Sequence, residues 1–199
     1  NPHIMRKTGI LAMNNFIKLF FFISNALILS LPLLAAENSY DGQNVSDRDF
    51  SGTPHANSSW IGCTAINTVF SSSRNPTDYT NSNFASANLT NASFIDATLS
   101  GANFTNANLN YVSFVDALLD DADFTNSIIT NTNMGKVVVR GFTKEQLYST
   151  ASYKNRDLTG IILANNNLKD WNFSGQNLSG TRFNLADLTG VDFTNSIIT

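Results

Sequence analysis

The sequence predicts an all-β protein whose chain winds as a solenoid of short extended pieces, and three observations lead to this prediction. Large apolar residues recur at every fifth position through the middle of the chain. A smaller residue stands two positions before each of them. Charged residues make up only 14% of the chain, and Asn, Ser and Thr supply most of its polar surface instead; an ordinary domain carries about 25% charged residues.

The five-residue period decides the fold class, because neither regular element can bury it. On an α-helix the apolar stripe would rotate around the axis and never form one face. On a continuous β-strand an odd period sends successive large residues to opposite faces. A short extended piece followed by a turn puts the large residue and the smaller one before it on the inside. A chain that turns after every repeat then winds into a coil, with stacked backbones about 4.8 Å apart.

Two runs of the chain carry the period. The first run, residues 77–135, is regular, whereas the second run, residues 158–199, keeps the same spacing more loosely. We expect the large residues at the repeat centres to form the core. These centres are Phe84, Leu89, Phe94, Leu99, Phe104, Leu109, Phe114, Leu119, Phe124 and Ile129 in the first run, and Leu178, Phe183, Leu188 and Phe193 in the second.

Segments such as Ala102–Asn106 and Ala122–Asn126 follow the pattern Ala, Asn or Asp, Phe or Leu, and two variable residues. In this they resemble the pentapeptide repeat family. The resemblance implies a right-handed, quadrilateral parallel β-helix with four repeats per coil. Residues four repeats apart then stack, and the sequence predicts two aromatic columns, Phe84–Phe104–Phe124 and Phe94–Phe114–Met134.

The second run departs from the small residue that precedes each centre. Large or polar residues take that position, and they do not fit easily inside a narrow coil. We therefore expect an irregular coil over Leu158–Leu178. The departing residues are Arg156, Asn166, Trp171 and Gln176.

Residues 136–157 separate the two runs and break the five-residue register. Thr143 and Gln146 match a capping box, which predicts a short helix over about 144–152. Leu147 and Ala151 lie one turn apart on it and are expected to face the coil. The segment is interpreted as a looped insertion that resets the register, and a dedicated binding element is the alternative.

Residues 1–36 are interpreted as leader residues followed by a signal peptide. Lys18 precedes an apolar stretch over 19–34, and Ala35–Ala36 suits signal-peptidase cleavage after Ala36. An uncleaved membrane anchor is the alternative, although the apolar core is short for the ~20 residues of a span. The sequence thus predicts a secreted or periplasmic protein that meets a membrane only through this segment.

Both ends of the repeat array are unusual. Residues 37–76 are interpreted as a degenerate first coil or cap, since Val45, Phe50 and Trp60 keep the period. At the other end, residues 192–199 repeat residues 123–130 letter for letter, and no capping segment follows them. Solenoid ends need a cap, so we expect the natural protein to continue, or two copies to stack end to end as a homodimer.

The sequence holds no recognisable catalytic set, so we expect a protein that is not an enzyme and needs no cofactor or metal. Cys63 with His55 is the one imaginable nucleophile pair, and a buried structural cysteine is the favoured interpretation. Four carboxylates form a candidate interaction patch, interpreted as a solvated acidic surface in preference to a Ca²⁺ site. They are Asp116, Asp120, Asp121 and Asp123.

These features favour a non-enzymatic, extracytoplasmic structural or protein-interaction scaffold with an unidentified protein or surface partner. The alternative is a binder of an ordered surface, polysaccharide or ice, through outward Asn and Thr side chains. Without Arg6, Lys7 and Lys18 the chain keeps nine basic and 15 acidic residues, a net charge of −6. The family resemblance therefore also implies a DNA mimic that binds topoisomerases if the protein is not exported. Such charge is sparse beside duplex DNA, and we expect no nucleic-acid partner.

Overall fold

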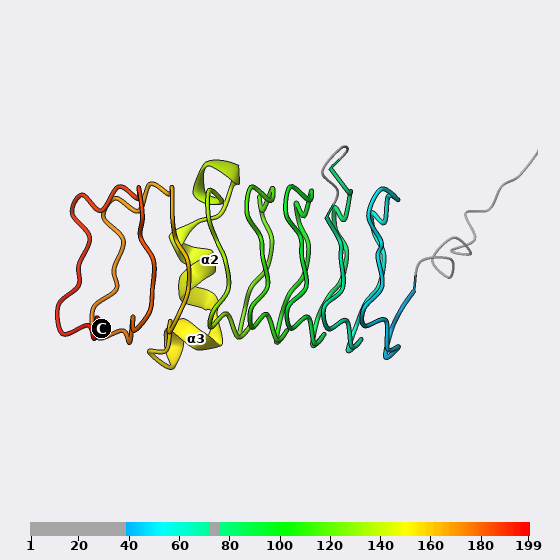
Figure 1. Ribbon diagram of the computed structural model, residues 1–199, viewed down its shortest axis with the longest axis horizontal. Coiled ribbons are helices and arrows are strands. Elements are labelled where there is room, and N and C mark those ends of the chain that lie inside the picture. The colour runs from blue at the N-terminus through cyan, green and yellow to red at the C-terminus, as the bar shows by residue number, and fades with distance from the viewer. Residues whose placement is uncertain (1–38, 72–75) are drawn as a thin grey trace, which may run out of the picture. The chain divides into compact units, whose positions relative to one another are not determined.

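The computed structural model describes residues 39–71 and 76–199, and the expected signal peptide lies outside them. Within these residues the backbone pairs in parallel between positions 20 apart, as in Asn83 with Asn103 and Asn103 with Asp123. Each coil therefore holds four five-residue repeats, and successive coils stack side by side (Figure 1). Throughout the described residues this pairing consists of isolated single-residue bridges, because the chain turns after each extended piece.

Each repeat turns at a residue whose backbone is left-handed. This residue lies two positions after the centre, and its φ is 59° at Asn106 and 57° at Asn126. Asn, Asp and Gly adopt this conformation at the lowest cost, and they fill most of these corners. Where Asn or Asp precedes the centre, its side chain stabilises the same turn, as Asn103 Oδ1 does by accepting a hydrogen bond of 2.8 Å from the Thr105 amide. The consensus Asn or Asp therefore serves the turn rather than the core.

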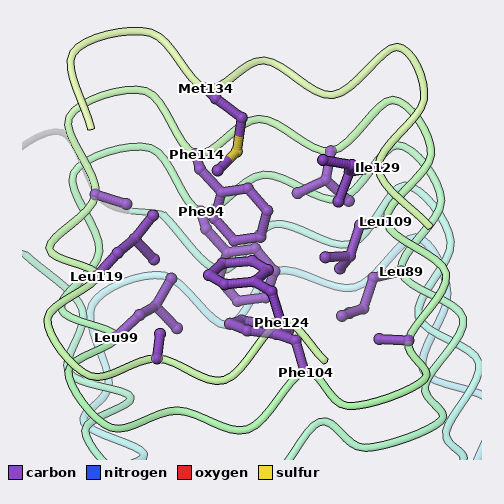
Figure 2. Packing of buried hydrophobic residues seen from close by; sticks show 14 of the residues in the cluster. Leu89, Phe94, Leu99, Phe104, Leu109, Phe114, Leu119, Phe124, Ile129 and Met134 are labelled. Carbon is purple, nitrogen blue, oxygen red and sulfur yellow. The ribbon is translucent and has the colours of Figure 1, made fainter. Parts of the chain in front are cut away.

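The predicted aromatic columns are confirmed (Figure 2). Phe104 stacks between Phe84 and Phe124, with ring centroids 5.1 and 5.2 Å away. Phe94 stacks on Phe114 at 5.4 Å. The two columns meet edge to face in the middle of the coil, as Phe94 and Phe104 do at 5.9 Å. The first-run centres from Phe84 to Ile129 are at most 1% exposed, so the interior is a close-packed rod.

The stack extends into the N-terminal coils. Trp60 lies between Tyr40 and Phe84, with ring centroids 3.9 and 5.6 Å away, and Phe70 stacks on Phe94 at 4.5 Å. Ser59 pairs with Asn83, which is 24 residues later, so this coil holds four more residues than a regular one. The degenerate repeats of this region therefore continue the same columns as the regular run.

The insertion between the runs contains a 3₁₀ turn, η1 (Val138–Arg140), and two short helices, α2 (Lys144–Ser149) and α3 (Ala151–Lys154), beside the coils in Figure 1. The predicted capping box at Thr143 is present. The prediction of one continuous helix over 144–152 is wrong, because Thr150 is extended and its side chain caps α3. The break turns Thr150 and Ser152 inward beside Leu147, and Ala151, expected to face the coil, is only partly buried.

The coil over Leu158–Leu178 is regular, so the expectation of irregularity there is wrong. Pairing returns to 20-residue spacing from Asp157 with Asn177 onward, and the centres Leu163, Leu168 and Phe173 are fully buried. Arg156 avoids the interior by lying exposed at a left-handed corner. The other three departing residues are buried where this coil packs against the insertion: Asn166, Trp171 and Gln176.

The last described coil is less buried than predicted. Leu188, expected in the core, is 37% exposed, and Phe183 and Phe193 are only partly buried. These side chains pack on the preceding coil alone, because no further described coil covers their other side. Leu178, one coil earlier, is 1% exposed and behaves as predicted.

Candidate functional site

Helix α2 packs against the last coil of the first run, where the insertion interrupts the five-residue path. Gln146 of α2 joins the two elements. Its Nε2 donates hydrogen bonds to the carbonyls of Leu119 (2.9 Å) and Ala122 (2.7 Å), and its Oε1 accepts one from the Thr143 amide (2.7 Å). One side chain thus caps the helix and pairs with the coil beneath it.

An open groove lies at this junction. Asp120, Asp121 and Asp123 line it from the coil, and Glu145 lines it from α2. Gly141 allows the chain to pass close to the coil, because a Cβ there would lie 2.8 Å from the Asp120 amide nitrogen, and its φ is +92°. We call these four carboxylates and their surroundings the acidic groove. The carboxylates give the acidic groove a negative charge, and Glu145 of α2 is exposed at its edge.

Asp123 is held in place by its neighbours. Its carboxylate accepts hydrogen bonds from the Thr125 amide at 2.8 Å and the Thr105 hydroxyl at 3.2 Å. Hydrogen bonding from Thr125, with a smaller contribution from Thr105, lowers the pKa of the Asp123 carboxyl below its usual value. This carboxylate therefore stays ionised and oriented at neutral pH.

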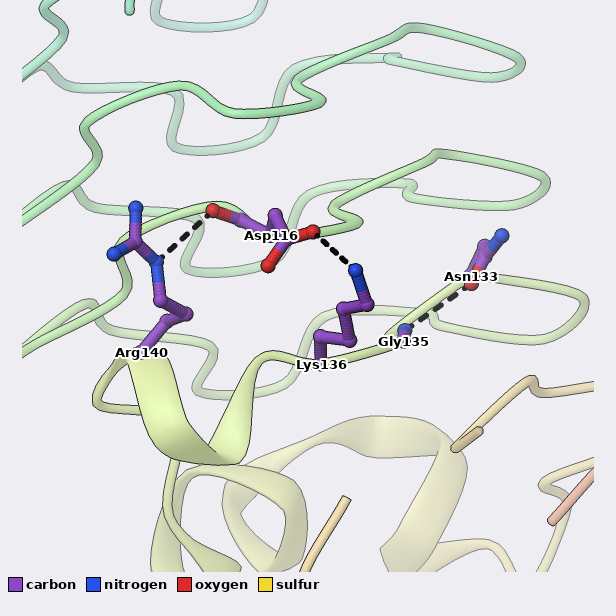
Figure 3. Close-up of polar contacts among 5 residues, drawn as sticks. All are labelled: Asp116, Asn133, Gly135, Lys136 and Arg140. Atoms are coloured by element: carbon purple, nitrogen blue, oxygen red, sulfur yellow. Dashed lines mark hydrogen bonds and ion pairs between the residues drawn. The ribbon is translucent and has the colours of Figure 1, made fainter. Parts of the chain in front are cut away.

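Asp116 does not line the acidic groove, so the structure separates this member of the predicted patch from the other three. It lies at a different corner, where its carboxylate pairs with Lys136 Nζ at 3.0 Å (Figure 3). Arg140 Nε also donates to the Asp116 backbone carbonyl at 3.2 Å. Successive repeats occupy different sides of the coil, which separates Asp116 from Asp120 and Asp121.

Two family models match the chain. One, described as a pentapeptide repeat region, covers residues 75–143, and the other, described as pentapeptide repeats (8 copies), covers residues 167–199. Together they span about half of the sequence. The chain belongs to the pentapeptide repeat family.

Solved structures resemble the chain with TM-scores below 0.5. A protein from the Arabidopsis thaliana thylakoid lumen is 27% identical, with 45% of this chain and 70% of that one covered and a TM-score of 0.28. HetL from the cyanobacterium Nostoc is 18% identical, with 80% and 70% covered and a TM-score of 0.38. QnrB1, a plasmid-mediated fluoroquinolone resistance protein, is 17% identical, with 81% and 89% covered and a TM-score of 0.30. No curated protein sequence matches the chain.

Cys63 and His55, which the sequence favoured as structural residues over a nucleophile pair, lie in the N-terminal coils of this pentapeptide repeat protein. Burial raises the pKa of the Cys63 thiol to about 12, so it is a neutral thiol at physiological pH. His55 contacts the Thr53 hydroxyl at 2.9 Å and stacks on Tyr79 at 5.4 Å. No hydrogen bond joins Cys63 to His55 in residues 39–71 and 76–199, and both side chains are buried.

The part of the chain that the structure describes contains no group of three or more His, Cys, Asp or Glu arranged to hold a metal ion. None of its helices has the length and apolar character needed to cross a membrane.

Sequence reasoning missed Glu145 and Gln146 as members of the acidic groove. The Thr143 capping box was the available signal, since it places Gln146 in the first turn of α2 next to Glu145. It could not indicate which coil the helix packs against, because that depends on how the insertion closes.

Proposed function

We propose that this pentapeptide repeat protein is a non-enzymatic, extracytoplasmic interaction scaffold whose acidic groove binds a basic segment of a protein partner. The observation that carries the proposal is the convergence of Asp120, Asp121, Asp123 and Glu145 on one groove. Elsewhere on the first run, repeats present similar Asn, Ser and Thr side chains on every side, so few positions are chemically distinct. The groove is distinct, because α2 takes the place of part of a coil.

The rigidity of the coil supports a preformed site. The aromatic columns run beneath the groove, with Phe124 lining it and also packing edge to face on Phe142 at 5.5 Å. The Gln146 side chain holds α2 against the coil, and the Thr143 cap closes the first turn of the helix. A partner therefore binds a groove that is already ordered, which avoids the entropic cost of ordering it.

The location is tested by fractionating cells that express the full-length protein and sequencing its N-terminus. Export predicts a mature chain that begins at Glu37 in the periplasm or medium. A soluble cytoplasmic product that begins at Met5 or Met13 would remove the export claim. The DNA-mimic alternative would then be the function to test.

The groove is tested by placing a photo-crosslinking residue at Asp121 and, in a matched variant, at Asn106. Both positions are exposed left-handed corners of the first run, but only Asp121 lines the groove. We expect one defined partner to cross-link at position 121 and not at 106. The cross-link should disappear in an Asp120→Asn, Glu145→Gln variant, which keeps side-chain size and removes charge. Equal cross-linking at both positions, or retention in the charge-removed variant, would refute the groove as the binding site.

A further inference from the structure

One corner of the coil carries a column of left-handed residues that changes character along its length. In its N-terminal part, Asn67 Nδ2 donates to Asp47 Oδ1 at 3.0 Å, and Asn91 Nδ2 donates to Asn67 Oδ1 at 3.2 Å. The next residue of the column is Tyr111, which ends this amide ladder. Asn131, Gly160 and Gly180 continue the column through the second run.

The backbone conformation of Tyr111 destabilises the fold. Its φ is 61°, a conformation that costs a side-chain-bearing residue about 1–2 kcal/mol, and it is rare for a bulky one. The side chain is also 59% exposed, so its ring gains little from burial. Neither feature helps the fold, and Asn or Gly fills most neighbouring corners at lower cost. Strain of this kind is typical of binding sites.

A groove runs along this corner from Tyr111 to Arg182. Gly160 and Gly180 line it, and a Cβ on Gly160 would collide with the Asn131 side-chain amide. Asn131, Thr159 and Ser179 supply amide and hydroxyl groups along it. Three coil steps of about 4.8 Å separate the corners of Tyr111 and Gly180, so the groove extends over roughly 14 Å.

Arg182 closes the far end with an available positive charge. It is exposed, and the one ion pair among residues 39–71 and 76–199 joins Lys136 to Asp116 instead. A guanidinium without a carboxylate partner is suited to bidentate recognition of a carboxylate on a ligand.

We propose that this groove binds an acidic polysaccharide built from uronate sugars. The exposed ring of Tyr111 would pack on the apolar face of a pyranose, as amphipathic aromatic rings do at binding surfaces. Sugar hydroxyls pair with Asn131, Thr159 and Ser179, and the uronate carboxylate pairs with Arg182. The groove shares no lining residue with the acidic groove, so this site does not depend on the function proposed above.

The test is isothermal titration calorimetry of the full chain with an oligogalacturonate and with a neutral cello-oligosaccharide. The key variant is Tyr111→Asn, which removes the ring and places at this corner the residue that Asn91 and Asn131 already carry. It should fold at least as stably as the wild type, so loss of binding cannot be blamed on misfolding. Arg182→Gln removes the charge, and Leu185→Asn makes a similar apolar-to-Asn change at an exposed left-handed corner outside the groove.

We expect the wild type to bind the oligogalacturonate, with affinity at least tenfold lower in Tyr111→Asn and Arg182→Gln and unchanged in Leu185→Asn. Absence of wild-type binding would overturn the proposal, and so would binding that survives Tyr111→Asn. Equal affinity for the neutral oligosaccharide, with no effect of Arg182→Gln, would overturn the assignment to uronate sugars.

Discussion

Asn166 occupies a position at which the repeat usually carries Ala, yet replacing it with Ala should destabilise the protein. The side chain is 3% exposed. Its Nδ2 donates to the carbonyls of Met134 (2.7 Å) and Leu163 (3.1 Å), and its Oδ1 accepts from the Val138 amide (3.0 Å). Met134 and Val138 lie where the chain leaves the coil for the insertion. Asn166 therefore pairs backbone groups that the irregular coil does not pair itself.

The magnitude follows from these three hydrogen bonds. A typical hydrogen bond contributes about 1 kcal/mol, and a buried group left unpaired costs about 1–3 kcal/mol. Because Val138 is only partly buried, water can reach part of this site, and we expect Asn166→Ala to lower the unfolding free energy by about 3 kcal/mol. For a domain of about 150–250 residues this corresponds to a fall in Tm of roughly 6–12 °C.

The assay is urea and thermal unfolding followed by circular dichroism. Asn184→Ala is the control, since Asn184 is exposed and its change should stay within about 0.5 kcal/mol of wild type. If Asn166→Ala matched or exceeded wild-type stability, the reasoning would be refuted. Asn166 would then be a tolerated departure from the repeat rather than a structural link to the insertion.

Three further predictions concern single side chains. Leu185 has a φ of 58° and 86% of its surface is exposed, so Leu185→Asn should raise the unfolding free energy by about 1 kcal/mol. Asn106→Leu, at the same position of its repeat, should lower it by a similar amount. Urea titrations that show no difference between the two variants would contradict a preference of the left-handed corner for Asn. Burial lowers the pKa of His55, so the unfolded chain takes up its proton first as pH falls below about 6.5. The stability that His55 contributes should be fully present above that pH and should fall as the pH approaches the lowered pKa of the folded state. The urea midpoint of His55→Phe should lose this pH dependence. An unchanged decline in the variant would assign the dependence to other groups. Burial raises the pKa of the Cys63 thiol to about 12, so this thiol should resist a thiol reagent in the native protein at neutral pH and react in urea. Mass spectrometry measures the labelling, and rapid labelling of the native protein would show that the thiol is accessible.

Much of the regular coil was predictable, because each repeat contacts only its neighbours in the stack. The spacing of Phe84, Phe104 and Phe124 was enough to predict their stacking once four repeats per coil were assumed. The capping box at Thr143 was equally local, since it depends on residues three apart. Leu188 shows the limit of this reasoning, because burial depends on a neighbouring coil as well as on the repeat position.

The candidate sites were less predictable. Asp116, Asp120 and Asp121 are close in sequence, but the coil turns between them and sends Asp116 to another corner. Glu145 joins Asp120 only because α2 folds back on the first run. The role of Asn166 was missed for the same reason, since its partners Met134 and Val138 belong to the preceding, irregular coil.

The sequence by itself determined the five-residue repeat, its inward centres and the turns that wind it into a coil, because these depend on contacts within a repeat and between regular neighbours. Only the tertiary structure decided which residues meet across the insertion. Asn133 pairs with Ile162, 29 positions later, so the coil that contains the insertion is nine residues longer than a regular one. That register brings Tyr111 and Arg182 to one groove and Glu145 to Asp120, because closing an irregular coil depends on side-chain contacts that a repeat pattern does not contain.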